Sequence, residues 1–223
     1  MLRTSKGKQR VKLTKYAHAC VTVESAGATV LLDPGAFNPE RAELMRAADA
    51  VLITHDHFDH YDADAIGTEI AQRPGLPVYA PESIAGRVDG VTAVWTGDEF
   101  TVGAISVRVY VQPHAFIYAD QPQTPNAAFL LTADGTSVYH PGDTYFVPDA
   151  AVDTLLVPTS GPWTKLGEAV QFVVDVSPRR AIQIHEYLAS ELGRQVSDKY
   201  LDASGGFTNV PFSSLADGAS VEL

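Results

Sequence analysis

The segment from His55 to His60 packs three histidines and two aspartates into six residues, in the order His-Asp-His-Phe-Asp-His. Imidazole nitrogens and carboxylate oxygens are ligands that zinc, manganese and iron prefer. His55 and His57 are two residues apart, so on an extended segment their side chains point the same way and can reach one ion. Asp59 and His60 follow after a turn and can reach a second ion. Because the whole chain has only seven histidines, chance explains this cluster poorly, and the segment predicts a metal site.

Other histidines and one aspartate also follow short runs of residues with strand character. These residues are His55 after 50–54, His114 after 107–111, His140 and Asp143 after 137–139, and His185 after 181–184. Open α/β sheets gather their ligand-binding residues at the carboxyl ends of strands. The repetition therefore predicts that these side chains meet at one edge of a sheet.

At this point the chain resembles the metallo-β-lactamase-fold hydrolases. The features that carry the likeness are His-x-His-x-Asp-His, a later histidine, Gly-Asp-Thr after a strand, and a final histidine after another strand. The match runs from about residue 16 to about residue 193. Segments 16–20, 32–35 and 139–144 are most similar to the ascorbate-phosphate lactonase-like subgroup of bacterial hydrolases, whose members are mostly uncharacterised. The resemblance implies an α/β fold, a four-layer αββα sandwich with two facing mixed β-sheets and the metals at one rim.

The resemblance also implies a set of ligands for two divalent metal ions. The first ion would be held by His55, His57 and His114, and the second by Asp59, His60 and His185, with Asp143 bridging the two. A set without a thiolate suits Zn²⁺, and it also suits manganese or iron. The single cysteine, Cys20, lies in an early expected strand, far from the ligand segments.

Two divalent ions that share a water lower its pKa from about 15.7 toward roughly 7, which yields hydroxide at neutral pH. Asp59 would bind one ion and could also accept a hydrogen bond from that hydroxide, so it is the expected catalytic carboxylate. The predicted reaction is hydrolysis of an ester, lactone or phosphoester bond in a small metabolite, anionic metabolites included.

Three polar residues could support the ligands, because metal-bound imidazoles need partners that orient them. Asp33 follows an expected strand and could accept a hydrogen bond from a ligand imidazole. His18 could pair with Asp33, or could be a buried histidine that the backbone satisfies. His140 lies three residues before Asp143 and could orient a ligand or contact the substrate.

Aromatic residues close to strand ends could line a substrate pocket, although such residues are more often part of the core or the rim. The predicted substrate contacts are Phe116, Tyr118, Tyr145 and Trp163, with Phe37 and Tyr187 as further candidates. Lys165 could steady an anionic group of the substrate, or could simply be solvated.

The surrounding elements show a repeated plan. A strand pair over 20–32 turns at Ala26-Gly27, and a second pair over 129–139 turns at Asp134-Gly135. The repeat indicates an internal pseudo-duplication. Helices are expected over 62–73, over 166–177 and from Leu188 to about Tyr200, where apolar residues recur every four positions.

Length and composition predict one metallo-hydrolase domain over 15–223, preceded by a flexible, basic arm over 1–14. The basic run is Arg3, Lys6, Lys8, Arg10, Lys12 and Lys15. No stretch reaches 18 apolar residues and the first residues lack an apolar core, so neither a membrane span nor a signal peptide is expected. One cysteine excludes an internal disulfide and fits a cytoplasmic location. The net charge of −11 makes nucleic acid an unlikely partner, and oligomerisation stays open.

Three alternatives to a dinuclear hydrolase remain. A mononuclear iron enzyme of the sulfur-dioxygenase type would use His55, His57, His114 and Asp143 on one ion and leave the other ligands idle. A phosphodiesterase that cleaves nucleic acid is disfavoured by the acidity, and a non-catalytic metal-binding protein need not keep all seven ligands.

Overall fold

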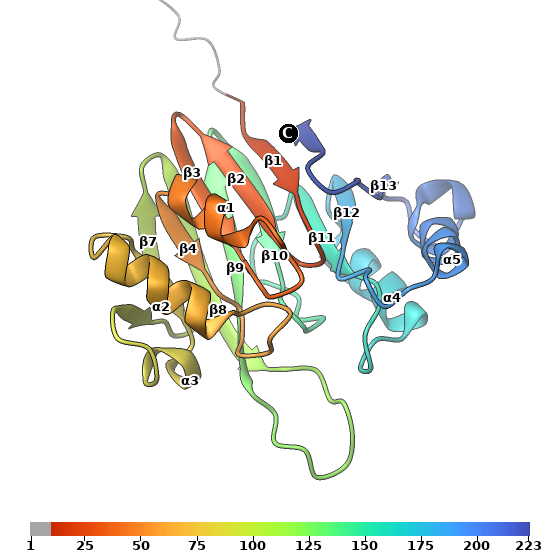
Figure 1. Cartoon of the computed structure of the whole chain (residues 1–223). Coiled ribbons are helices and arrows are strands. Elements are labelled where there is room, and N and C mark those ends of the chain that lie inside the picture. The colour runs from red at the N-terminus through yellow and green to blue at the C-terminus, as the bar shows by residue number, and fades with distance from the viewer. Residues whose placement is uncertain (1–9) are drawn as a thin grey trace, which may run out of the picture.

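A computed structural model of the chain describes residues 10–223, which form two seven-stranded β-sheets (Figure 1). The first sheet has the order β14-β1-β2-β3-β4-β5-β6 and the second the order β13-β12-β11-β10-β9-β8-β7. The first sheet consists of β1 (Lys12–Lys15), β2 (Val21–Ser25), β3 (Ala28–Leu32), β4 (Ala50–Leu52), β5 (Val78–Ala80), β6 (Val91–Ala93) and β14 (Ser220–Glu222). The second consists of β7 (Glu99–Val102), β8 (Ile105–Pro113), β9 (Pro125–Ala133), β10 (Thr136–His140), β11 (Thr154–Pro158), β12 (Arg180–Ile184) and β13 (Phe212–Ser213).

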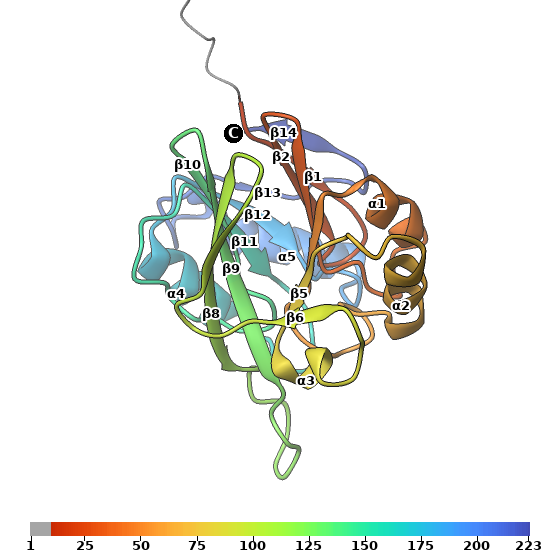
Figure 2. The same ribbon diagram turned by 90° about the vertical axis from the view of Figure 1, so that its left-hand side faces the viewer.

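Helices cover the outer faces of both sheets (Figure 2). They are α1 (Arg41–Ala47), α2 (Ala63–Gln72), α3 (Glu82–Ala85), α4 (Leu166–Val176), α5 (Glu191–Leu201) and the 3-10 helix η1 (Ala203–Gly205). Helices α1 to α3 pack on the first sheet, and α4 and α5 pack on the second. None of these helices combines the length and the apolar character that crossing a bilayer would require.

The core follows from side chains that alternate between the two faces of each strand. On β3, Val30 and Leu32 point into the core between the sheets, whereas Leu31 points to the helices. Phe129 and Ile182 of the second sheet enter the same central core. Each sheet is buried on both faces, by the other sheet on one side and by helices on the other, so its central strands are apolar. The layers are therefore helix, sheet, sheet and helix. This confirms the predicted αββα sandwich.

The two sheets share one strand plan. In the first, β1, β2 and β3 are antiparallel neighbours, and β3 to β6 then run parallel. In the second, β7 to β10 are antiparallel neighbours, and β10 to β13 then run parallel. The repeated plan agrees with the predicted pseudo-duplication. It also directs the carboxyl ends of β1, β3 and β4 to one edge of the first sheet, and those of β8, β10, β11 and β12 to one edge of the second.

Two expectations about boundaries need correction. Lys12, Leu13 and Thr14, assigned to the flexible arm, belong to β1, because β2 and β14 pair with this strand on its two sides. Residues 1–9 of the expected arm lie outside the described residues. Helix α5 begins at Glu191 rather than at Leu188, and Ser190 caps its first turn by accepting from the Gly193 N–H.

The apolar row along α5 faces away from the core. Leu192, Val196 and Tyr200 are exposed, and Ser197 and Leu201 are the buried side chains of the helix. A spacing of four residues predicts one helix face correctly but does not say which way that face points. The expected helix over 62–73 is present as α2, and the helix before Pro178 is present as α4.

The two corresponding hairpin turns differ at one residue. Ala26 and Gly27 have φ of 53° and 81°, and Asp134 and Gly135 have φ of 48° and 75°. Two consecutive residues with positive φ form the tight turn in which Asn-Gly and Asp-Gly are preferred, because asparagine and aspartate tolerate this region better than alanine. We therefore expect Ala26→Asn to raise the free energy of unfolding by about 1 kcal/mol.

Denaturant unfolding would measure this change. The matched control is Asp134→Ala, which places alanine at the same position of the other turn and should lower stability by a similar amount. Both side chains are exposed, so neither substitution disturbs packing. An unchanged stability in Ala26→Asn would show that this turn is not strained.

Candidate metal centre

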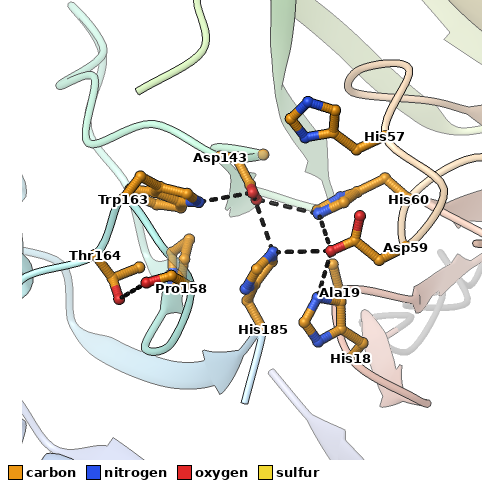
Figure 3. A network of polar contacts seen from close by, with 12 residues as sticks. His18, Ala19, His57, Asp59, His60, Asp143, Pro158, Trp163, Thr164 and His185 are labelled. Atoms are coloured by element: carbon orange, nitrogen blue, oxygen red, sulfur yellow. Dashed lines mark hydrogen bonds and ion pairs between the residues drawn. The ribbon is translucent and has the colours of Figure 1, made fainter. Parts of the chain in front are cut away.

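All seven predicted ligands come together at one rim of the sandwich. Figure 3 shows five of them: His57, Asp59, His60, Asp143 and His185. Together with His18, the seven ligands form two groups of four residues, and within each group the ligand atoms lie within 4.8 Å of one another. The first group is His55, His57, His114 and Asp143, and the second is His18, Asp59, His60 and His185. Each of these residues follows the carboxyl end of a strand, as the sequence predicted for all of them except His18.

Asp143 lies between the two groups. Its Oδ2 is 3.4 Å from His114 Nε2 in the first group and 3.0 Å from His185 Nε2 in the second. Its Oδ1 is 3.1 Å from His60 Nε2. A carboxylate in this place can offer one oxygen to each of two cations.

The donor atoms fit metal ions. His60 Nε2, His114 Nε2, His185 Nε2 and Asp143 Oδ1 are buried, and although they lie close together, none makes a hydrogen bond of suitable geometry within the described chain. Leaving such atoms without partners costs about 1–3 kcal/mol each. Cations coordinated at this place would satisfy these atoms, and imidazole with carboxylate suits zinc, manganese or iron.

The electrostatics of the group agree with this fit. Burial alone would raise the pKa of Asp143, but the His185 and His60 imidazoles hold this pKa well below its usual range. Burial holds the pKa of His55 well below its usual value, so this imidazole is neutral, as a ligand must be. Burial would also lower the pKa of His185, but the Asp143 carboxylate raises it to about 9. A cation coordinated by His185 would therefore displace a proton.

Asp33 is a buried carboxylate that contacts the ligand candidate His60. Its fully buried carboxylate accepts hydrogen bonds from the Thr54 N–H at 2.8 Å and the Thr54 hydroxyl at 2.7 Å. Its Oδ2 also lies 2.7 Å from His60 Nδ1, which leaves His60 Nε2 directed toward Asp143. The structure thus places Asp33 where the sequence predicted a partner for a ligand imidazole.

His18 does not pair with Asp33. Its Nε2 lies 3.0 Å from Asp59 Oδ2, and its carbonyl accepts from the His185 N–H at 3.1 Å. Burial lowers the pKa of His18 to about 4, so the ring is neutral. His18 is therefore a ligand candidate that the sequence interpretation missed, although it follows β1 as the other ligands follow their strands.

His140 lies beneath the rim rather than in contact with a substrate. It is fully buried; its Nδ1 accepts from the Gly142 N–H at 3.1 Å, so its Nε2 donates to the Ala19 carbonyl at 2.9 Å. His140 therefore ties the end of β10 to the loop that carries His18. The suggested role as a substrate contact does not agree with this position.

The turn that presents Asp143 depends on Asn126, which sequence reasoning did not single out. Asn126 Oδ1 accepts from the Asp143 N–H at 2.9 Å, and its amide donates to the Pro141 carbonyl at 2.8 Å. Gly142 has φ of 63°, and a Cβ there would lie 2.2 Å from Asn126 Oδ1. A side chain at position 142 would collide with Asn126, so only glycine fits there.

A buried ion network holds the loop after β12. Lys15, which the sequence grouped with the basic run, is only 1% exposed. Its ammonium group contacts the Glu186 carboxylate, Asp217 Oδ1 at 3.0 Å and the Tyr16 carbonyl at 2.7 Å. Glu186 directly follows His185, so this network fixes the backbone that presents that imidazole.

The predicted substrate contacts divide into two sets. Trp163 lines a pocket of about 330 Å³ over the ligands, and its Nε1 donates to Asp143 Oδ2 at 2.8 Å. Tyr145 packs behind Trp163 and donates to the Pro158 carbonyl at 3.0 Å. Phe116 and Tyr118, exposed by 62% and 74%, lie outside the pocket lining on the long loop between β8 and β9, which projects from the molecule (Figure 1).

Among the further candidates for substrate contact, one lines the pocket and the others do not. Phe37 lines the pocket, whereas Tyr187 stacks on Phe37 and donates its hydroxyl to Asp217. Lys165 is largely exposed and pairs with Glu168 at 2.7 Å, so it is not directed at the pocket. Phe58, inside the ligand motif, lines the pocket and was missed, although its place in the motif was a usable signal.

Known proteins are similar to this chain in sequence. The family model described as Beta-lactamase superfamily domain matches residues 12–185. Protein Rv0786c of Mycobacterium tuberculosis is 32% identical over 214 residues, which are 95% of this chain and 99% of that protein. A UPF0173 metal-dependent hydrolase of Pyrobaculum arsenaticum is 31% identical over 190 residues, which are 76% of this chain and 81% of the relative. The chain belongs to the metal-dependent hydrolases of the metallo-β-lactamase superfamily.

A solved structure supports the same fold. The metallo-β-lactamase fold protein YhfI of Bacillus subtilis has a TM-score of 0.73 at 14% identity and covers 97% of this chain and 100% of its own. The predicted superfamily is thus confirmed, and the enzyme is a metal-dependent hydrolase. The narrower resemblance to lactonase-like hydrolases stays a prediction.

In this metallo-β-lactamase-fold hydrolase, we expect Asp33→Ala to weaken metal binding by about ten- to a hundredfold, because His60 loses the partner that orients it. Stability should fall by about 1–3 kcal/mol, since the buried Thr54 N–H loses its acceptor. Competition with a chromophoric chelator would measure metal affinity, and denaturant unfolding would measure stability.

The matched control is Asp49→Ala, which also removes a carboxylate that accepts from a backbone N–H, that of Thr29 at 2.8 Å. Asp49 is exposed and far from the ligands in the fold, so metal affinity should not change. Equal affinities in both variants would show that Asp33 does not orient the His60 ring.

Proposed function

We propose that this protein is a dinuclear hydrolase that cleaves an ester, lactone or phosphoester bond in a small metabolite. The observation that carries the proposal is that the Asp143 carboxylate, a member of the first group, also lies within 3.1 Å of His60 and 3.0 Å of His185 in the second group. His55, His57 and His114 would hold one ion, Asp59, His60 and His185 the other, and Asp143 both. Two such divalent ions, most simply Zn²⁺, lower the pKa of a shared water toward about 7 and polarise the oxygen under attack.

Asp59 is the proposed catalytic carboxylate. It lines the pocket, and its Oδ2 lies 3.0 Å from His18 Nε2 and 3.5 Å from His185 Nε2. Burial alone would raise the pKa of Asp59, but these imidazoles hold it well below its usual range. Asp59 therefore stays ionised at neutral pH, so it can accept a hydrogen bond from the attacking nucleophile and aim its lone pair.

The main alternative is a mononuclear iron oxygenase on the same scaffold. Such an enzyme would need only the group around His55, His57 and His114, yet Asp59, His60 and His185 converge just as closely. Metal analysis separates the two: near two zinc or manganese ions per chain supports the hydrolase, and one iron per chain supports the oxygenase. Cleavage of nucleic acid is disfavoured because the net charge is −11.

A substrate screen with zinc- and manganese-loaded protein would find the bond type. Lactones, phosphodiesters and thioesters form the panel, and the His57→Ala protein is the blank because it lacks a proposed ligand. Turnover that survives in the blank would point to a contaminant.

We expect Asp59→Asn to lower kcat by about 10²–10⁴-fold, because a neutral amide accepts a hydrogen bond far more weakly than an ionised carboxylate and cannot take up the nucleophile's proton. Metal analysis of the same sample should still find close to two ions. The matched control is Asp64→Asn, the same change at an exposed position in the first turn of α2, which should keep full turnover. Full turnover of Asp59→Asn with both metals bound would overturn the role given to Asp59.

A further inference from the structure

The pocket over the ligands has an apolar wall. Its base is formed by His57, Asp59, His114, Asp143 and His185, and its wall by Phe37, Phe58, Ile117, Pro162, Trp163 and Leu188. The wall residues come from loops that follow β3, β4, β8, β11 and β12. Several separate loops thus contribute apolar side chains to one space.

Parts of this wall are rigid and parts are free to meet a ligand. Phe37 is held between Phe58, with ring centroids 5.2 Å apart at 90°, and Tyr187, with centroids 5.9 Å apart. Phe58 and Leu188 are 64% and 65% exposed although they flank the ligand residues. Large apolar side chains exposed around a pocket are typical of a binding site for apolar groups.

No lysine or arginine lines the pocket among the described residues. Nearby cations already have acidic partners: Lys15 has Glu186 and Asp217, and Arg87 has Asp56. A neighbouring hollow shares His57, His114 and Ile117 with the pocket, and its other lining residues, 115 and 121–124, are uncharged. An anionic group away from the scissile bond would thus find no cationic side chain in the lining to offset the hydration that it loses there.

We infer that the substrate carries an uncharged, apolar substituent next to the scissile bond, and that the wall of Phe58, Ile117 and Leu188 selects it. This inference rests on the proposed hydrolase function. It narrows the substrate class to neutral esters or lactones with an aliphatic or aromatic acyl group. The inference also excludes anionic metabolites, which the sequence analysis had kept among the possible substrates, because Lys165 does not face the pocket.

Matched p-nitrophenyl esters test the inference with the zinc- or manganese-loaded protein. From acetate to butyrate to hexanoate, kcat/KM should rise by about fourfold per methylene until the wall is covered. The mono-succinate ester has nearly the length of the butyrate but ends in a carboxylate. This carboxylate attacks its own ester bond, so the rate without protein is measured and subtracted. Its kcat/KM should be lower by at least about a hundredfold.

A charge placed on the wall should change this preference. We expect Leu188→Lys to raise the succinate-to-butyrate ratio of kcat/KM by at least about tenfold, because the new ammonium can pair with the carboxylate. The matched control is Leu192→Lys in α5, a leucine of 68% exposure that lies outside the pocket lining. This control adds the same charge without altering the wall, so its ratio should equal that of the native protein.

Binding gives a readout that does not need turnover. Acetohydroxamate, hexanohydroxamate and succinic monohydroxamate share a metal-binding head and differ in the tail, and calorimetry on the metal-loaded protein gives their affinities. The hexano compound should bind at least about tenfold more tightly than the other two. If no ester is cleaved but this order holds, ester hydrolysis fails as the proposed reaction and the apolar wall stands.

The opposite results would overturn the inference itself. These are equal affinities for the hexano and succinic hydroxamates, or native protein that cleaves the succinate ester as fast as the butyrate. Ester cleavage in that case would leave the hydrolase proposal intact. A ratio that is unchanged in Leu188→Lys would remove Leu188 from the selecting wall.

Discussion

The structure depends on one buried carboxylate that lies among the imidazoles of two groups. Asp143 is fully enclosed, and its two oxygens face His60, His114 and His185 at 3.0–3.4 Å. A buried carboxylate without positive partners would be strongly destabilising, because the desolvation penalty for an isolated charge is large. The imidazoles, together with bound cations, compensate for this penalty. The fold can therefore keep a charge in its interior only while the strands from both sheets hold their ends together.

Three of the non-glycine residues with positive φ among the described residues lie at the same rim. His18, Asp33 and His185 have φ of 60°, 47° and 59°, in a region that favours glycine. Strain of this kind costs about 1–3 kcal/mol per residue and persists only where the surroundings enforce it. Here the hydrogen bond from the His185 N–H to the His18 carbonyl and the contacts of Asp33 enforce it. With this backbone conformation, each of the three side chains contacts a residue of the candidate metal centre.

Features that are local in the sequence or that recur along it, such as a ligand residue after a strand, could be predicted from the sequence. The ligands were found because each follows its own strand, and parallel strands bring such positions to one edge. The pocket wall was predicted poorly because it depends on how loops from distant parts of the chain turn. On the loop between β8 and β9, Phe116 and Tyr118 were chosen because they are aromatic and follow a strand end, yet the side chain between them, Ile117, lines the pocket. Likewise, spacing along α5 gave a helix face but not its direction.

The buried Lys15 also has a consequence for how the protein matures. Its two acidic partners, Glu186 and Asp217, lie 171 and 202 residues later in the chain. While the protein is being synthesised, β1 therefore carries an ammonium group that cannot be buried until nearly every other strand has left the ribosome. The loop that presents His185 is tied to the same closing event, because Glu186 directly follows His185. In a nascent chain, the backbone on either side of this imidazole is therefore fixed only late in synthesis.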